Sequence, residues 1–182
     1  EENWKRPRKE VSLLMRLLRR FLIRERGEIM DNGVRLTAVG RLHRLPLDVR
    51  TELEKTREMS AQNDGMTLCL ALSYGGRQEI VDAARALARK VKRGELSPDD
   101  ITENLVTAHL YQERMPPLDL LIRTAGEVRV SNFLLWQLSY AEIYVTPSCW
   151  PEFREEELDQ SLDEYARRVR KFGGLVPENW RG

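Results

Sequence analysis

The run of residues 66–72 is the feature that most constrains what this chain can fold into. It is almost continuously apolar, and Asn63-Asp64-Gly65 before it is a strong turn signal. Strands that are apolar on both faces are typical of parallel sheets, which helices cover from both sides. Since parallel strands need long crossover connections, the rest of the chain should supply helices between its strands.

The apolar spacing elsewhere fits that requirement. A broad apolar face predicts a helix over residues 8–26, either central to a core or lining an apolar cavity. The full pattern predicts helices at 8–26, 46–62, 80–93, 132–140 and 154–171, a helix start at 97–100, and strands at 34–40, 66–72, 118–124 and 142–146. We therefore predict an α/β fold, a mostly parallel sheet flanked by helices, in a single domain of residues 1–182.

Length and charge exclude several classes of protein. The chain has 182 residues, which suits one domain, and 30 Lys and Arg against 29 Asp and Glu give a net charge of +1. Because the charge is balanced, we expect no nucleic-acid partner. No apolar run is long enough to span a bilayer, and residues 1–5 show none of the apolar character of a signal-peptide core. The lone cysteines Cys69 and Cys149 favour a reducing, cytoplasmic location.

Polar side chains follow two of the predicted strands, at the edge where such folds bind ligands. They are Arg77 after the second strand and Arg123, Glu127, Arg129 and Ser131 after the third. Guanidinium groups match phosphate oxygens, and Ser131 opens a predicted helix whose free N–H groups would attract an anion. The sequence therefore favours a phosphate or diphosphate site, with surface ion pairs to nearby acids as the alternative.

Two further features have more than one interpretation. Glu142 starts an otherwise apolar strand, where its carboxylate is either a Mg²⁺ ligand or an ordinary strand-end acid. Residues 3–7 form a helix-entry turn in which Trp4 packs, or contribute to a site. An apolar helix beside a diphosphate site points to a prenyl diphosphate as the ligand.

Four motifs occur in one order along the chain. The longest is residues 119–138, which continues through Tyr140-Ala141-Glu142 to Trp150-Pro151. The others are Glu2-Asn3-Trp4-Lys5-Arg6-Pro7 with Glu10-Val11, then Tyr74-Gly75-Gly76-Arg77, and Phe172-Gly173-Gly174. In these motifs the chain resembles the cis-prenyltransferases, most closely the bacterial undecaprenyl diphosphate synthases. The first motif is highly specific, whereas each of the others is weak by itself.

The resemblance implies an activity. The family condenses isopentenyl diphosphate onto an allylic diphosphate, here expected to be farnesyl diphosphate, and makes cis double bonds. The expected product is a long-chain, undecaprenyl-type polyprenyl diphosphate, a lipid carrier for cell-wall synthesis. The resemblance also implies Mg²⁺ as the cofactor, a homodimer, and an apolar tunnel beside the sheet. Release of a lipid would bring the cytoplasmic protein into transient, peripheral contact with a membrane.

The same resemblance implies roles for individual residues. Isopentenyl diphosphate is expected to bind Arg123, Arg129, Ser131 and the backbone of Val130, while Glu142 holds Mg²⁺ across the dimer. Asn3 is the candidate proton acceptor, and the other substrate-binding residues are expected to be Glu1, Glu2, Trp4 and Arg6. The helix at 8–26 would form a wall of the tunnel, with Met66 at its floor limiting product length.

The chain also departs from the family pattern. Family members begin with a strand and a phosphate-binding loop, Asp-Gly-Asn-Gly-Arg, whose Asp is the main Mg²⁺ ligand, and this segment does not occur here. We expect it to precede residue 1 in a longer enzyme. The alternative is a non-catalytic partner subunit of a two-component cis-prenyltransferase, against which the intact stretch 123–131 argues. Ser73 replaces the usual Asn, Lys171 the usual Arg, and Val128 a more polar residue.

Overall fold

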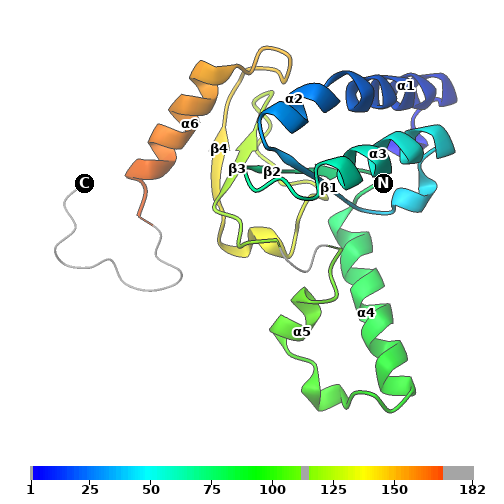
Figure 1. Cartoon of the computed structure of the whole chain (residues 1–182). Coiled ribbons are helices and arrows are strands. Elements are labelled where there is room, and N and C mark those ends of the chain that lie inside the picture. The colour runs from blue at the N-terminus through cyan, green and yellow to red at the C-terminus, as the bar shows by residue number, and fades with distance from the viewer. Residues whose placement is uncertain (1, 112–114, 170–182) are drawn as a thin grey trace. The chain divides into compact units, whose positions relative to one another are not determined.

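The computed structural model (Figure 1) describes residues 2–111 and 115–169. The chain divides into two compact units. The first unit ends at Arg114 and the second begins at Met115. Each unit contains one pair of parallel strands accompanied by helices. The predicted class, helices with parallel strands, is therefore confirmed.

The first unit alternates helices and strands in the predicted order. Its α-helices are α1 (Arg8–Arg24), α2 (Arg26–Asp31), α3 (Leu47–Met59), α4 (Gly76–Lys92) and α5 (Glu103–Thr107), and its strands are β1 (Arg35–Val39) and β2 (Thr67–Ala71). Short 3-10 helices cover Glu2–Lys5, Leu42–Arg44 and Pro98–Asp100. β1 and β2 pair in parallel, from Arg35 opposite Thr67 to Val39 opposite Ala71. Both strands therefore end at the same edge of the pair.

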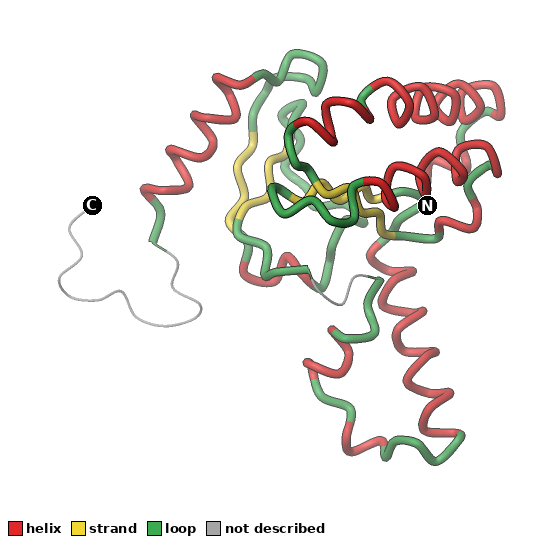
Figure 2. The backbone as a smooth tube through the Cα atoms, in the orientation of Figure 1, coloured by secondary structure: helices red, strands yellow, loops and turns green. Residues whose placement is uncertain are grey.

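The core of the first unit lies between this strand pair and the helices α1 and α3, which lie side by side (Figures 1 and 2). Leu22 of α1, Leu36 of β1 and Leu53 of α3 are buried in one cluster. Burying each leucine contributes about 1.5 to 3 kcal/mol to folding. The inner face of α1 thus belongs to the core, as the first interpretation of its broad apolar face predicts.

Two details of the first unit differ from the sequence prediction. The helix predicted at 8–26 is interrupted at Glu25, whose φ of −85° and ψ of −1° separate α1 from α2. The strand predicted at 66–72 is not buried on both faces: Thr67 and Ala71 are exposed, and Met66 is 67% exposed. Among the residues described in this unit, β2 pairs with β1 alone, so one of its edges has no covering strand.

The second unit contains β3 (Leu120–Arg123), a 3-10 helix at Gln137–Tyr140, β4 (Glu142–Val145) and α6 (Glu155–Arg167). β3 and β4 pair in parallel, with Leu120 opposite Glu142. The helix predicted at 132–140 is wrong, because only its last turn is helical. Ser131 and Leu134 have φ values of 58° and 46°, and left-handed residues this close together interrupt an α-helix.

The end of the chain agrees with the prediction as far as the structure describes it. The helix predicted at 154–171 forms α6, which begins with three glutamates and ends with Arg167, as the helix dipole favours. Lys171 and the motif at 172–174 lie outside the described residues. In the described parts of the chain, no helix has the length and apolar character needed to cross a membrane.

The ends of β1 and β2 approach each other at Gly40. This glycine has a φ of +113°, and a Cβ added to it would lie 2.2 Å from the carbonyl oxygen of Leu72. The backbone N–H of the next residue, Arg41, donates to the carbonyl oxygen of Ser73 at 3.2 Å. The absence of a side chain at position 40 therefore allows the two strand ends to remain in contact.

We expect Gly40→Ala to lower the free energy of unfolding by about 1 to 3 kcal/mol, because both the backbone angle and the space oppose a Cβ. Urea denaturation of the full-length protein measures this loss. Gly27→Ala is the control, since a Cβ there meets nothing within 4 Å. Alanine in that helix should leave stability unchanged or raise it by up to about 1 kcal/mol. Equal stability of Gly40→Ala and the wild type would contradict the close approach.

Candidate functional site

The indole of Trp4 links the N-terminal segment to the end of β2. Its Nε1–H donates to Ser73 Oγ at 2.8 Å. The guanidinium of Arg44 lies over the indole, 5.2 Å from the ring centroid, which is within the range of a cation–π interaction. These two contacts fix Trp4, and with it the 3-10 helix that carries Asn3, at the carboxyl end of the strand pair.

A pocket of about 280 Å³ opens at this place, and we call it the strand-end pocket. Its lining residues are Asn3, Trp4, Val11, Leu14, Met15, Leu18, Leu45, Ala71, Leu72, Ser73 and Tyr74. Polar groups come from Asn3 and the turn after β2, whereas α1 contributes apolar side chains. The sequence left open whether this helix is central to a core or lines an apolar cavity. Helix α1 does both, because its inner face packs in the core and part of the same face lines the pocket.

Met66 does not line the strand-end pocket. It precedes the first residue of β2, whereas the pocket is lined by the last residue, Ala71, and by the turn that follows it. Five strand residues separate the two ends by roughly 16 Å. The role of Met66 as a tunnel floor stays a prediction, and the 67% exposure of its side chain gives that role no support.

The turn after β2 is held from inside by a buried carboxylate. Ser73 has a φ of 48°, a conformation that asparagine tolerates better than serine, so the family's usual residue is the less strained one here. The hydroxyl of Tyr74 donates to Glu79 Oε2 at 2.6 Å. The other oxygen of Glu79 accepts the backbone N–H of Tyr111 at 3.0 Å, and Glu79 is 2% exposed. The turn is thereby tied to α4 and to the end of the first unit.

A second network, which the sequence prediction missed, lies beside the first. Arg41 Nε donates to Asp82 Oδ2 at 3.0 Å and its Nη2 donates to Oδ1 at 3.1 Å, while the hydroxyl of Tyr111 donates to Oδ2 at 2.6 Å. The Tyr111 ring also packs edge-on against Tyr74, with centroids 6.0 Å apart. One available signal was the spacing of Glu79 and Asp82, which places both carboxylates on one side of α4.

Burial and hydrogen bonding set the protonation of this network. Burial of the phenol and its hydrogen bond to Asp82 raise the pKa of Tyr111 to about 12. Burial opposes ionisation of Asp82, but hydrogen bonds from Tyr111 and Arg41 outweigh it, so the pKa of Asp82 is lowered. At neutral pH the network therefore consists of an ionised carboxylate held by a cation and a neutral phenol.

In the second unit, one carboxylate gathers the arginines that follow β3. Arg123 is the last residue of β3, and its guanidinium donates to Glu127, as does that of Arg129. The hydrogen bond from Arg123 is the main cause of the lowered pKa of Glu127. Both arginines thus form the surface ion pairs with a nearby acid that the sequence analysis gave as the alternative to a phosphate site. Arg123 Nε is nevertheless buried without a hydrogen-bond partner in the described residues, so its guanidinium retains an unused donor.

The loop that carries these residues is strained and anchored. Ala125 and Gly126 have φ values of 63° and 64°, and Ser131 has 58°. The N–H groups of Ala125 and Gly126 donate to the carbonyl oxygens of Ser148 and Thr146 at 2.8 and 2.9 Å, which ties the loop to the one after β4. Left-handed conformations at alanine and serine cost energy and concentrate at functional sites. The predicted helix start at Ser131 is wrong, because residues 131–136 form turns and bends. The side chain of Ser131 is nevertheless exposed.

Glu142 begins β4, as predicted, and is half-buried in an ion pair. Arg168 Nη1 donates to Glu142 Oε2 at 3.1 Å and to the carbonyl oxygen of Ile143 at 2.9 Å, and its Nη2 contacts Glu164. No group of three His, Cys, Asp or Glu side chains forms a metal site within residues 2–111 and 115–169. Since Mg²⁺ commonly uses one or two carboxylates plus substrate phosphates, Glu142 fits as one ligand and not as a complete site.

The remaining predicted residues have these positions. Glu2 is exposed in the first 3-10 helix, and Glu1 lies outside the described residues. Arg6 Nη1 pairs with Glu10 Oε1, and both side chains are about half exposed. Val130 is half-buried in the loop after β3. Arg77 belongs to the first unit and Arg123 to the second, so the convergence of all three arginines on one edge stays a prediction.

Comparison with known proteins decides the family. Residues 1–173 match the family model described as "Putative undecaprenyl diphosphate synthase". The chain belongs to the undecaprenyl diphosphate synthase family. The predicted family and enzyme class, a prenyltransferase of the undecaprenyl diphosphate synthase type, are therefore confirmed.

Similar proteins and a solved structure agree with the assignment to this family. The chain is 50% identical over 174 residues to an isoprenyl transferase of Rhodopirellula baltica, covering 96% of this chain and 71% of that protein. It is 43% identical to the farnesyl-diphosphate-specific ditrans,polycis-undecaprenyl-diphosphate synthase of Escherichia coli K12, covering 97% and 70%. Lavandulyl diphosphate synthase from Lavandula x intermedia, solved with dimethylallyl diphosphate, superposes with a TM-score of 0.91 at 41% identity, covering 94% and 75%. The chain spans 65% of the isoprenyl transferase of Chlorobaculum tepidum.

The raised pKa of Tyr111 predicts a loss of stability at alkaline pH. An unfolded tyrosine loses its proton near pH 10, but folded Tyr111 keeps it to a pKa of about 12. Since the folded state holds more protons in that window, its stability should fall as the pH rises from about 10 to about 12. Urea unfolding at a series of pH values should show this fall in the wild type and lose it in Tyr111→Phe. Tyr140→Phe, which removes a hydroxyl from a residue that is 65% exposed, should behave as the wild type. An identical alkaline slope in Tyr111→Phe would contradict the assignment.

Proposed function

We propose that the protein condenses isopentenyl diphosphate onto an allylic diphosphate, farnesyl diphosphate as starter, with formation of cis double bonds. The product is a long-chain, undecaprenyl-type polyprenyl diphosphate that serves as a lipid carrier for cell-wall synthesis. The observation that carries this proposal is the pair of guanidiniums gathered on Glu127, with the Nε donor of Arg123 buried and unused. A diphosphate satisfies such donors, since planar guanidinium forks match its oxygens.

In this proposal, charged and apolar residues bind different parts of the substrates. Arg123 and Arg129 bind the diphosphate of isopentenyl diphosphate, with the Ser131 hydroxyl and the Val130 backbone as further donors or acceptors. In the strand-end pocket, the apolar side chains of α1 hold the hydrocarbon chain of the allylic substrate. Fixing two diphosphates in this way contributes to the rate by orientation, because the carbon atoms that react are brought into contact.

Asn3 and Trp4 act at the polar end of the strand-end pocket. The reaction develops positive charge on the allylic carbon and negative charge on the leaving diphosphate. Because Asn3 is an amide and a weak base, its part in the proton loss is to orient a water molecule or the diphosphate. Glu2 and Arg6 complete the proposed substrate-binding set, although neither lines the strand-end pocket. In this proposal Arg6 exchanges its ion pair with Glu10 for a phosphate.

Mg²⁺ is the proposed cofactor, and Glu142 its ligand in this chain. The bound ion supplies electrostatic stabilisation of the leaving diphosphate. To reach the ion, Glu142 has to leave the ion pair with Arg168. We also propose a homodimer, a cytoplasmic location and transient contact with the membrane through the lipid product. Residues 1–182 then belong to one catalytic domain, and the intact cluster at 123–131 favours an enzyme over a non-catalytic partner subunit.

Arg123→Ala in the full-length enzyme should raise KM for isopentenyl diphosphate at least tenfold, because a charge-assisted hydrogen bond to phosphate contributes about 1.5 to 3 kcal/mol. Steady-state kinetics with both substrates varied measures the change. The KM for the allylic substrate should change much less. Arg167→Ala removes an exposed arginine of α6 and should leave both constants unchanged. An unaltered KM for isopentenyl diphosphate in Arg123→Ala would refute the assignment.

Metal removal tests the role of Glu142. Chelation should abolish condensation, and Glu142→Gln should raise the Mg²⁺ concentration for half-maximal activity roughly tenfold or more. A Mg²⁺ titration of the initial rate measures this. Glu156→Gln, on the exposed first turn of α6, is the matched control. If Glu142→Gln titrates as the wild type does, the carboxylate does not bind the metal.

A further inference from the structure

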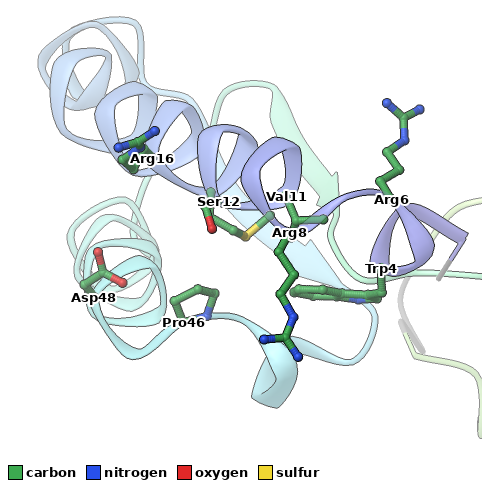
Figure 3. Close-up of a pocket in the computed structure, with 9 residues that line it drawn as sticks. Trp4, Arg6, Arg8, Val11, Ser12, Arg16, Pro46 and Asp48 are labelled. Carbon is green, nitrogen blue, oxygen red and sulfur yellow. The ribbon is translucent and has the colours of Figure 1, made fainter.

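A polar cluster in the second unit has no role in the reaction proposed above. It consists of Thr146 and Ser148, in the loop after β4, and of Glu157, in the first turn of α6. It differs in this from the pocket between α1 and the start of α3 (Figure 3), which is lined by Trp4 and Arg6 of the proposed substrate-binding set. The cluster is bonded to the loop that carries the arginines.

Backbone hydrogen bonds make that connection. The N–H of Thr146 donates to the carbonyl oxygen of Arg123 at 2.9 Å, and the carbonyl oxygen of Thr146 accepts the N–H of Gly126, also at 2.9 Å. The carbonyl oxygen of Ser148 accepts the N–H of Ala125 at 2.8 Å. Ala125 has a φ of 63°, which costs energy at a residue with a Cβ and persists only where the surroundings hold it. The loop after β4 therefore holds the backbone of the arginine-bearing loop.

The carboxylate of Glu157 holds the loop after β4 in turn. The hydroxyl of Ser148 donates to Glu157 Oε1, and the hydroxyl of Thr146 donates to the same oxygen at 3.5 Å. The N–H of Ser148 also donates to Thr146 Oγ1 at 3.3 Å. The other oxygen, Glu157 Oε2, accepts the backbone N–H of Arg154 at 3.2 Å, as in a helix-capping box. Because the two oxygens have separate partners, the contact with Ser148 can be removed without removing the cap.

Glu157 lies on the inner face of α6. Ser161, one helical turn further on, is fully buried, and Glu157 itself is half-buried. The preceding residues Glu155 and Glu156 are exposed. Hydrogen bonds to an ionised carboxylate are stronger than those between neutral groups, so Glu157 restrains the loop more firmly than a neutral acceptor would.

We propose that Glu157 is a positioning residue for isopentenyl diphosphate. It acts through Thr146 and Ser148, whose backbone fixes residues 123–126, and so orients the guanidinium of Arg123 for the diphosphate. The buried, unpartnered Nε of that guanidinium is the donor whose direction this arrangement decides within the described residues. Glu157 itself touches no substrate. The inference rests on the proposed function, in which Arg123 binds this diphosphate.

Glu157→Ala in the full-length enzyme should raise KM for isopentenyl diphosphate roughly three- to thirtyfold, because the loop that carries Arg123 is misplaced. The KM for the allylic substrate should change much less. Ser148→Ala should raise the same KM, although it leaves the helix cap in place. A loss of folded enzyme would lower kcat and leave both KM values unchanged. Steady-state kinetics with both substrates varied measures the difference.

Glu156→Ala is the matched control, since it removes an exposed carboxylate from the same turn of α6. Both of its KM values should equal those of the wild type. An unaltered KM for isopentenyl diphosphate in Glu157→Ala would overturn the inference. A rise in Glu157→Ala without one in Ser148→Ala would assign the effect to the helix cap, and would also overturn it.

A double-mutant cycle tests whether Glu157 acts through Arg123. In the variant with both residues replaced by alanine, KM for isopentenyl diphosphate should rise by less than the product of the two single increases, because the guanidinium to be positioned is already absent. Increases that multiply would show that the two residues act independently, and would overturn the proposed path.

Amide hydrogen exchange tests the positioning without turnover. In Glu157→Ala and Ser148→Ala, the N–H groups of Ala125 and Gly126 should exchange at least about threefold faster than in the wild type, because their acceptors are less restrained. The amides of β1 in the first unit should keep their wild-type rates. Unchanged exchange at Ala125 and Gly126 would overturn the inference. If the wild type does not condense the two substrates, the proposed function fails, whereas exchange still decides whether Glu157 holds the loop.

Discussion

The contact between Gly40 and the end of β2 is the constraint on which the first unit depends. It brings Arg41, the second residue after β1, within hydrogen-bond distance of the Ser73 carbonyl oxygen, and the Ser73 hydroxyl in turn accepts the indole N–H of Trp4. The same strand end continues into Tyr74, which the buried Glu79 holds. The polar groups of the strand-end pocket are therefore positioned by backbone packing and by two side-chain hydrogen bonds, and the apolar groups by the burial of α1.

The arginine cluster of the second unit shows how one arrangement can satisfy two interpretations. Glu127 pairs with both Arg123 and Arg129, so the ion pairs expected of surface arginines are present. Yet the carboxylate also holds the two guanidiniums at one place, in a loop whose left-handed residues are fixed by bonds to the loop after β4. An arriving diphosphate meets donors whose orientation is already set, which reduces the entropy that binding has to overcome.

Local patterns predicted some elements well and others poorly, for identifiable reasons. Helices α1, α3 and α4 lie where apolar spacing placed them, because each buries one stripe of side chains. The residues at 132–136 have helix-like apolar spacing but turn instead, because Leu134 and Ser131 adopt left-handed angles that no periodicity reveals. Met66 belongs to an apolar run and is nevertheless exposed, since burial depends on which strands and helices cover it.

The sequence by itself determined the family, the alternation of helices with parallel strands, and the residue types needed for a diphosphate. These follow from motif order and from short-range periodicity, which act within a few residues of each other. Only the tertiary structure decided that Arg41, Asp82 and Tyr111 form one network, that Glu142 is held by Arg168, and that Trp4 is bonded to Ser73 at the strand-end pocket. Each of these contacts joins residues more than 20 positions apart, and such contacts depend on how the elements pack, which local patterns do not specify.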